Sequence, residues 1–198
     1  MITLKAVSLS TLVVLGLATP PFIAPVQAQM SANPPEVAAK IREMGPRLGR
    51  EVIRGTRKLY APLQKMAPKD DVKITRNLAY GTHERHRLDV FQPTTTSTQP
   101  APVVVFLHGG GYVRGDKRGF GNVGVYFARH GVVGITANYR LAPQSKWPSG
   151  PEDIGNMIKW IKANVATYGG DANKIFLMGN SAGTGHVASY VFFDEFHV

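Results

Sequence analysis

The sequence predicts an α/β fold in which helices flank a mainly parallel sheet. Val103–Leu107 and Val132–Ala137 are continuous apolar runs rich in β-branched residues, which is typical of strands buried on both faces of a parallel sheet. Lys174–Met178 is a third predicted buried strand. Pro151–Val165 has the apolar spacing of an amphipathic helix and separates the last two of these strands. Alternating strands and helices favour parallel pairing.

The composition is that of a globular protein. The 198 residues include 23 Lys and Arg against 13 Asp and Glu, a formal charge of +10, and 43% are hydrophobic. A domain of this length buries enough surface for a substantial core. The chain has no cysteine, which excludes disulfides, thiolate metal sites and a cysteine nucleophile. We expect no metal and no cofactor.

Residues 1–28 have the features of a secretory signal peptide. Lys5 precedes the apolar run Ala6–Ala18, and the segment ends in Val26-Gln27-Ala28, which fits a signal-peptidase site. An uncleaved membrane anchor is the alternative, although the run is shorter than the ~20 residues that span a bilayer. Cleavage after Ala28 leaves 170 residues, with 22 basic and 13 acidic side chains, in the periplasm or outside the cell.

Residues 29–70 form a predicted N-terminal helical segment. Apolar residues recur at helical spacing from Val37 to Met66, and Gly45-Pro46 and Gly55 interrupt the pattern, which predicts two or three short helices. A basic stripe has the same spacing: Arg47, Arg50, Arg54 and Arg57. The stripe is either a solvated helix face or a contact for an anionic surface. No aromatic residues interleave with it, which disfavours nucleic acid as a partner.

Residues 71–198 carry the predicted sheet. Val72–Tyr80 and Arg87–Phe91 are predicted strands joined by the polar turn at residues 81–84, and the Pro- and Thr-rich segment 93–102 is a predicted loop. The full predicted order is strand, strand, strand, helix, strand, helix, strand, helix. The last helix starts at about Ala182.

The sharpest motif is Gly179-Asn180-Ser181-Ala182-Gly183, between a predicted strand and the last helix. Such a G-x-S-x-G turn presents the serine hydroxyl above the sheet while its backbone is strained. Gly179 and Gly183 allow the strand and the helix to approach closely. Ser181 is therefore the candidate nucleophile.

A second motif, His108-Gly109-Gly110-Gly111-Tyr112, directly follows the strand Val103–Leu107. Its glycines leave backbone N–H groups uncovered, and such donors stabilise the oxyanion that forms in acyl transfer. Gly110 and Gly111, with the N–H of Ala182, are the candidate oxyanion-hole donors, and Gly109 shapes the turn. A phosphate-binding loop is disfavoured because neither G-x-x-x-x-G-K-[ST] nor G-x-G-x-x-G occurs at this strand end.

These motifs resemble the α/β-hydrolase esterases and lipases of the hormone-sensitive-lipase and carboxylesterase type. The resemblance rests on three runs in order: HGGGY at 108–112, NYRLAP at 138–143 and GNSAG at 179–183. Gly115-Asp116-Lys117 is similar to the feruloyl-esterase-like or arylformamidase-like branch. The resemblance implies a serine hydrolase that cleaves small-molecule carboxylic esters through an acyl-enzyme. It also implies that Tyr139 and Arg140 are structural.

Several other polar residues are interpreted as structural from the sequence. Asp153 lies at the start of a predicted helix and is interpreted as a capping residue. His108 precedes the glycines and is interpreted as orienting that loop. Three further histidines are expected on the surface: His83, His86 and His130.

The histidine and the carboxylate that Ser181 requires are not found at the expected places, because in this fold they follow the serine on later loops. Beyond Ser181 the sequence has only 17 residues, among them His186, Asp194, Glu195 and His197. His186 is predicted to point away from the serine on the same helix, and the others lie at its far end. We therefore expect residues 71–198 to be the N-terminal part of an α/β-hydrolase domain, a fragment with little or no turnover. The alternative is a non-catalytic binding protein on a hydrolase scaffold.

Overall fold

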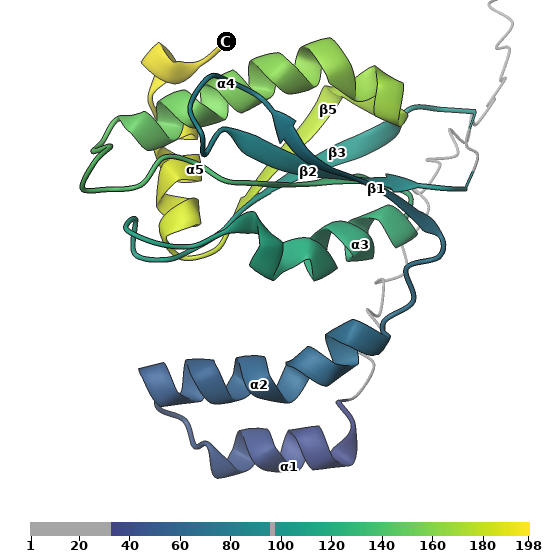
Figure 1. Ribbon diagram of the computed structural model, residues 1–198, viewed down its shortest axis with the longest axis vertical. Helices are drawn as coiled ribbons and strands as arrows, with labels where there is room; N and C mark the ends of the chain where they lie inside the picture. Colours follow the sequence, from purple (N-terminus) through teal and green to yellow (C-terminus); the bar gives the residue numbers. More distant parts are fainter. Residues whose placement is uncertain (1–32, 96–97) are drawn as a thin grey trace, which may run out of the picture. The chain divides into compact units, whose positions relative to one another are not determined.

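The computed structural model describes residues 33–95 and 98–198 (Figure 1). The chain divides into two compact units between Leu59 and Tyr60. The predicted signal peptide lies outside the described residues. Within the part of the chain that is described, no helix is both long and apolar enough to cross a membrane.

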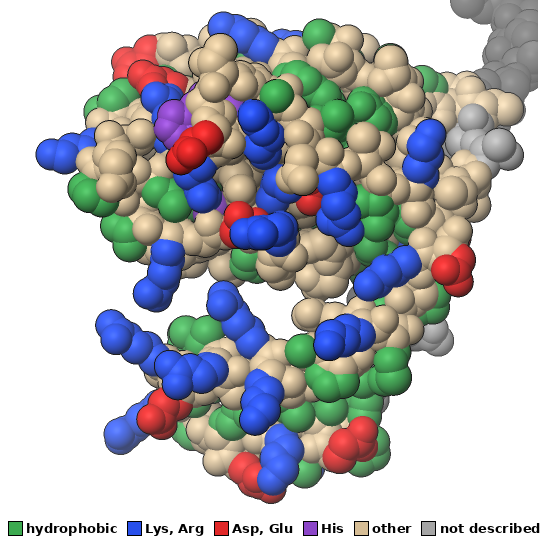
Figure 2. All heavy atoms as spheres, in the orientation of Figure 1, with side chains coloured by type: hydrophobic (Ala, Val, Ile, Leu, Met, Phe, Trp, Pro, Cys, Tyr) green, Lys and Arg blue, Asp and Glu red, His purple; other side chains and the backbone are tan. Residues whose placement is uncertain are grey.

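The described part of the first unit is helical. It contains α1 (Pro35–Glu43) and the start of α2 (Arg50–Met66), and Gly45 between them has a φ of 72°. Gly55 does not interrupt α2, because it lies inside the helix facing Met44, whose Cε would be 3.1 Å from an added Cβ. The arginines of the basic stripe are exposed, and Figure 2 shows Lys and Arg side chains around these helices.

The second unit contains a five-stranded sheet whose strand order is β1-β2-β4-β3-β5. The strands are β1 (Val72–Ala79), β2 (Arg87–Pro93), β3 (Ala101–Leu107), β4 (Val133–Ala137) and β5 (Gly170–Gly179). The predicted α/β class and the order of elements are confirmed. The sheet is mixed rather than mainly parallel: β3 pairs in parallel with β4 and β5, but the β1–β2 hairpin joins it through antiparallel pairing of β2 with β4.

Helices cover both faces of the sheet (Figure 1). The helix α3 (Gly121–Arg129) follows the short 3₁₀ helix η1 (Lys117–Phe120) and packs on one face, against Phe91. The helices α4 (Ser149–Asn164) and α5 (Ala182–Phe192) pack on the other face, where the main core lies. Two further 3₁₀ helices are η2 (Val165–Tyr168) and η3 (Asp194–Phe196).

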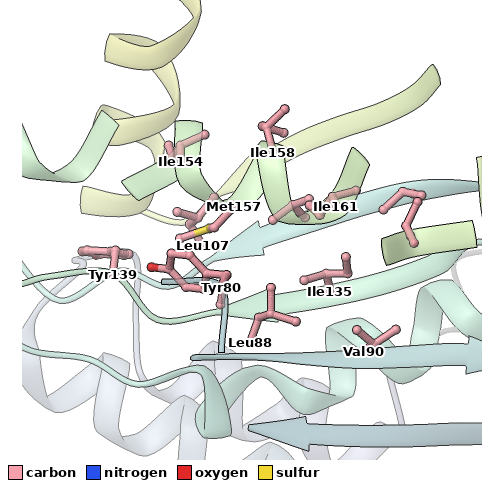
Figure 3. Packing of buried hydrophobic residues seen from close by; sticks show 14 of the residues in the cluster. Tyr80, Leu88, Val90, Leu107, Ile135, Tyr139, Ile154, Met157, Ile158 and Ile161 are labelled. Atoms are coloured by element: carbon pink, nitrogen blue, oxygen red, sulfur yellow. The ribbon is translucent and has the colours of Figure 1, made fainter. Parts of the chain in front are cut away.

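The main core forms between α4 and the sheet (Figure 3). The helix contributes the apolar face expected from its spacing: Ile154, Met157, Ile158 and Ile161. The strands contribute Leu88, Val90, Leu107 and Ile135, among others. These side chains are almost completely buried, so apolar burial fixes the sheet beneath the loops at its carboxyl edge.

A buried ion pair joins η1 to β2. Lys117 Nζ lies 2.6 Å from Asp89 Oδ1 and 2.8 Å from Asn77 Oδ1, and the Lys117 and Asp89 side chains are 3% and 1% exposed. Asp89 also accepts hydrogen bonds from the Asn77 backbone N–H and from Arg76. The Gly115-Asp116-Lys117 segment therefore ends on a fixed anchor inside the second unit.

Removing that anchor is expected to destabilise the protein strongly. Lys117→Ala leaves the Asp89 carboxylate buried without its lysine, which typically costs about 3–5 kcal/mol of unfolding free energy. The matched control is Lys174→Ala, since Lys174 pairs with Asp171 at the surface and its loss should change little. Urea unfolding of both variants checks this, and equal midpoints would contradict it.

Candidate active site

Ser181 lies between β5 and α5 in a strained backbone conformation. Its φ is 50° and its ψ is −116°, values that a non-glycine residue rarely adopts. The neighbouring glycines make this turn possible. A Cβ on Gly179 would collide with the backbone nitrogen of Thr184, and a Cβ on Gly183 would collide with the carbonyl oxygen of Leu107. The geometry is that of the sharp strand-to-helix turn that exposes a serine hydroxyl.

The glycine-rich loop after β3 lies directly against this turn. An added Cβ on Gly109 would be 2.6 Å from Asn180 Oδ1 and 3.0 Å from Ser181 Cβ. Gly110 and Gly111 have φ values of 144° and 62°, which favour glycine. The backbone N–H groups of Gly110, Gly111 and Ala182 form no hydrogen bond with another described residue. The structure thus brings the predicted donors and Ser181 into one site.

The segment after β4 packs against the glycine-rich loop. Tyr139 is fully buried, its ring stacks on His108 at 4.4 Å between centroids, and its hydroxyl donates to the His108 carbonyl oxygen at 2.7 Å. Burial raises the pKa of Tyr139 to about 12, so its hydroxyl remains a donor. The Ala142 N–H donates to the Tyr112 carbonyl at 2.9 Å. Tyr139 therefore has a structural contact, as the resemblance implies.

Arg85, in the turn between β1 and β2, was not singled out by the sequence. Its Nε donates to the Tyr139 carbonyl at 2.7 Å, and its Nη2 donates to the Gly115 carbonyl at 3.0 Å. The same Nη2 lies 3.4 Å from His108 Nε2. No local pattern marks this residue, because all three contacts are distant in sequence. One guanidinium thus connects both ends of the glycine-rich loop to the segment after β4.

Asp153 is a buried anchor and not a helix cap, so that interpretation was wrong. The helix α4 is preceded by Pro148 and has no side-chain cap, whereas Asp153 is completely buried within it. Its carboxylate accepts hydrogen bonds from the Arg140 N–H and Nε, each at 2.7 Å. His86 Nε2 lies 3.0 Å from the same carboxylate. Arg140 is therefore held by α4, and this fixes the loop after β4.

The surface interpretation was also wrong for His86, which is 6% exposed and stacks on Tyr80. Burial lowers its pKa, although the nearby Asp153 opposes that effect. His130 is exposed as expected, and His83 is partly buried. The sequence could not reveal the burial of His86, because its carboxylate partner comes from a helix far along the chain.

The remaining candidates for a base form no hydrogen bond with Ser181 among the described residues. His186 is 8% exposed, with the rings of Tyr112 and Tyr139 packed edge-on against it, and it lines a cavity of about 220 Å³ with Trp147. His197 Nε2 bonds instead with the Tyr190 carbonyl, at 2.8 Å. Among residues 33–95 and 98–198, no histidine or carboxylate forms a hydrogen bond with Ser181 Oγ.

A family model described as BD-FAE matches residues 88–194, more than half of the sequence. The chain belongs to the BD-FAE family. The matched range includes the glycine-rich loop, the segment after β4 and the serine turn. The resemblance to α/β-hydrolase esterases is therefore confirmed, and the arrangement just described is that of a BD-FAE chain.

Two curated relatives of this BD-FAE chain are named as esterases. It is 35% identical over 123 residues to a probable isoprenylcysteine alpha-carbonyl methylesterase, ICMEL2, of Arabidopsis thaliana, a match that covers 62% of this chain and 29% of the relative. It is 37% identical over 116 residues to Esterase LipC of Mycobacterium tuberculosis, covering 58% and 28%. The chain thus spans less than a third of the length of these relatives.

Solved structures share the fold. The bacterial heroin esterase has a TM-score of 0.60 and 27% identity, over 82% of this chain and 53% of that chain. Esterase B from Lactobacillus rhamnosis has a TM-score of 0.61 and 22% identity, over 78% of this chain and 48% of that chain. The mixed sheet with flanking helices is therefore an α/β-hydrolase fold.

Adding one methyl group to the glycine-rich loop tests its contact with the serine turn. Gly109→Ala places a Cβ against Asn180 and Ser181 and should destabilise the protein by about 1–3 kcal/mol, as overpacking usually does. Gly119→Ala is the matched control, because nothing lies within 4 Å of its added Cβ. Thermal unfolding compares the two variants, and a Gly109 variant as stable as the control would refute the contact.

Buried histidines predict a pH dependence of stability. Burial lowers the pKa of His86, His108 and His186 below the ordinary value of 6.5, so the folded state binds fewer protons than the unfolded state. The stability that these neutral histidines contribute is fully present above pH 6.5. It is lost as the pH falls through their lowered pKa values in the folded state. Urea unfolding at pH 7.5, 6.5 and 5.5 should show falling stability. His186→Gln should flatten this slope, whereas the exposed control His130→Gln should not.

Proposed function

We propose that this BD-FAE chain carries the nucleophile and the oxyanion hole of a serine hydrolase that cleaves small-molecule carboxylic esters. The observation that carries the proposal is the strained Ser181 beside a glycine-rich loop with uncovered N–H groups. The names of the relatives, among them an esterase and a probable methylesterase, support ester hydrolysis.

In the proposed reaction, Ser181 Oγ attacks the ester carbonyl carbon and a general base takes its proton. The carbonyl oxygen becomes an oxyanion, to which the N–H groups of Gly110, Gly111 and Ala182 donate. The oxyanion collapses, the alcohol leaves with the proton returned by the base, and water then hydrolyses the acyl-serine. Each well-placed donor in such a site contributes about 3–4 kcal/mol to transition-state stabilisation.

The base and its orienting carboxylate are, in this proposal, contributed by sequence other than these 198 residues. No histidine among the described residues forms a hydrogen bond with Ser181 Oγ, and the relatives are more than three times as long as the matched part. The same observation favours the second candidate function, a non-catalytic binding protein on the hydrolase scaffold. A reactivity test of Ser181 separates the two.

Ser181→Ala in the full natural gene product should lower hydrolysis of a short-chain ester by about 10⁴-fold or more and abolish labelling by a fluorophosphonate. Ser189→Ala is the control, because Ser189 lies on the same helix and its hydroxyl donates to the Gly185 carbonyl. Retained labelling in the Ser181 variant, or none in the native protein, would reject the hydrolase proposal and leave the binding protein.

The 198-residue chain by itself should hydrolyse the same ester at close to the rate of its own Ser181→Ala variant. The physical reason is that a serine hydroxyl is a weak nucleophile near neutral pH without a base. Steady-state assays of the two purified chains compare them directly. A large difference between their rates would show that a base lies within this sequence.

We also propose that the protein is secreted or periplasmic, based on residues 1–28. Cleavage after Ala28 predicts a mature protein that begins at Gln29. N-terminal sequencing of the protein from its native host checks this prediction. A mature protein that retains Met1 and stays with the membrane fraction would support the anchor instead.

A further inference from the structure

The His108 ring forms a hydrogen bond with one peptide group of the glycine-rich loop. Its Nδ1 lies 2.9 Å from the Gly109 carbonyl oxygen, which only accepts hydrogen bonds, so Nδ1 must carry the proton. The Gly109–Gly110 peptide is trans, and in a trans peptide the C=O and N–H groups point in opposite directions. Holding the Gly109 carbonyl toward His108 therefore turns the Gly110 N–H away from it.

The other ring nitrogen of His108 is controlled by Arg85. A guanidinium only donates, so Nε2, which lies 3.4 Å from Arg85 Nη2, must be the unprotonated acceptor. Two independent partners thus assign the same neutral tautomer, with its proton on Nδ1. The guanidinium also disfavours a second proton on this ring, because two cations would then face each other. Burial lowers the pKa of His108 further in the same direction.

Hydrogen bonds to two backbone carbonyl groups hold the Arg85 side chain in position. It donates to the carbonyls of Tyr139 and Gly115, at 2.7 and 3.0 Å. Within the described part of the chain it forms no ion pair with a carboxylate, so its charge is not neutralised by a direct partner. Gly115 leaves room for this arrangement, because a Cβ there would collide with His108 Nδ1 and with the Gly109 carbonyl.

We propose that Arg85 is a positioning residue for the oxyanion hole, acting through the tautomer of His108 to orient the Gly110 N–H. This inference rests on the proposed function for its catalytic consequence, but its structural part does not. Among the described residues, the Arg85 side chain forms no hydrogen bond with Ser181, Gly110, Gly111 or Ala182. The proposed path runs from the guanidinium to the imidazole to the Gly109–Gly110 peptide. Arg85 also contacts the far end of the loop directly, at the Gly115 carbonyl.

Charged and titratable groups around His108 come from four segments. Arg85 lies on the β1–β2 turn, Asp116 follows the glycine-rich loop, Tyr139 stacks on the ring, and His186 approaches from α5. Asp116 keeps its negative charge over the relevant range. Burial raises its pKa, but hydrogen bonds from Arg118 and Asn138 outweigh this and bring it to about 2. Changes at His108 between pH 5.5 and 8 are therefore not caused by titration of Asp116.

The structural test uses the full 198-residue chain labelled with ¹⁵N at histidine. Long-range ¹H–¹⁵N spectra at pH 8 should show His108 as the Nδ1–H tautomer. In Arg85→Met, which removes the donor, His108 should populate the Nε2–H tautomer and its pKa should rise. Arg85→Lys keeps the positive charge but has one nitrogen in place of three, and should retain part of the native signature. Arg87→Met is the control, since the Arg87 side chain donates to the His86 carbonyl and to no other described residue.

An Nε2–H or doubly protonated His108 in the native chain at pH 8 would overturn the proposal. A His108 spectrum unchanged by both Arg85 substitutions would also overturn it. If Arg85→Met fails to fold, the Arg85→Lys variant decides, because loss of one of the donors must still shift the His108 resonances.

The catalytic test uses the full natural gene product. Loss of one oxyanion donor typically lowers kcat by 10²–10³, so a misoriented Gly110 N–H should lower kcat by about tenfold to a hundredfold in Arg85→Met, with KM nearly unchanged. An equal loss in kcat and rise in KM would contradict the positioning role. Absence of Ser181 labelling in every variant, with the histidine spectra as expected, would reject the proposed function and leave the assigned peptide orientation intact.

Discussion

The parallel pairing of β3 with β5 is the constraint on which the rest of the site depends. Leu107 pairs with Gly179 at the carboxyl ends of these strands, and the Asn180 N–H donates to the Leu107 carbonyl at 3.0 Å. Two motifs that are far apart in the sequence therefore leave the sheet side by side. The close approach of Gly183 to the same carbonyl adds a steric limit, because no side chain larger than hydrogen fits there. Register and glycine together place the loop on the serine turn.

The loops at this edge have no backbone ladder, so buried polar side chains determine their shape. Asp89 holds Lys117, Asp153 holds Arg140, and Arg85 holds His108. The first two pairs connect the loops to β2 and α4, and the third connects the glycine-rich loop to the β1–β2 turn. Each pair is costly to break, because a buried polar group would lose its partner. The strained backbone of Ser181 persists only because its surroundings are fixed in this way. The buried pairs that support the loops therefore also maintain the strained backbone of Ser181.

The sequence predicted the features that have a local pattern. Apolar runs marked β3, β4 and β5, the spacing of α4 marked its buried face, and the two glycine motifs marked the strand ends where they occur. It did not predict the mixed sheet, because strand order depends on which edges meet. Nor did it predict the burial of Asp153 and His86 or the contacts of Arg85. A single polar residue looks the same in a sequence whether it lies in solvent or bonds to a partner far along the chain.

The same contrast applies to the proposed oxyanion hole, whose donors can be positioned without a base. Donor geometry is set by backbone direction, and every element that sets it lies within residues 85–183: the β1–β2 turn, the β3 end, the β4 end and the serine turn. A general base, in contrast, is one side chain that must reach Ser181 Oγ from another loop. Backbone N–H groups do not depend on a side chain from another loop, because their orientation is fixed before any substrate binds. Order in the glycine-rich loop is therefore a property of this part of the fold itself, and it can be measured independently of turnover.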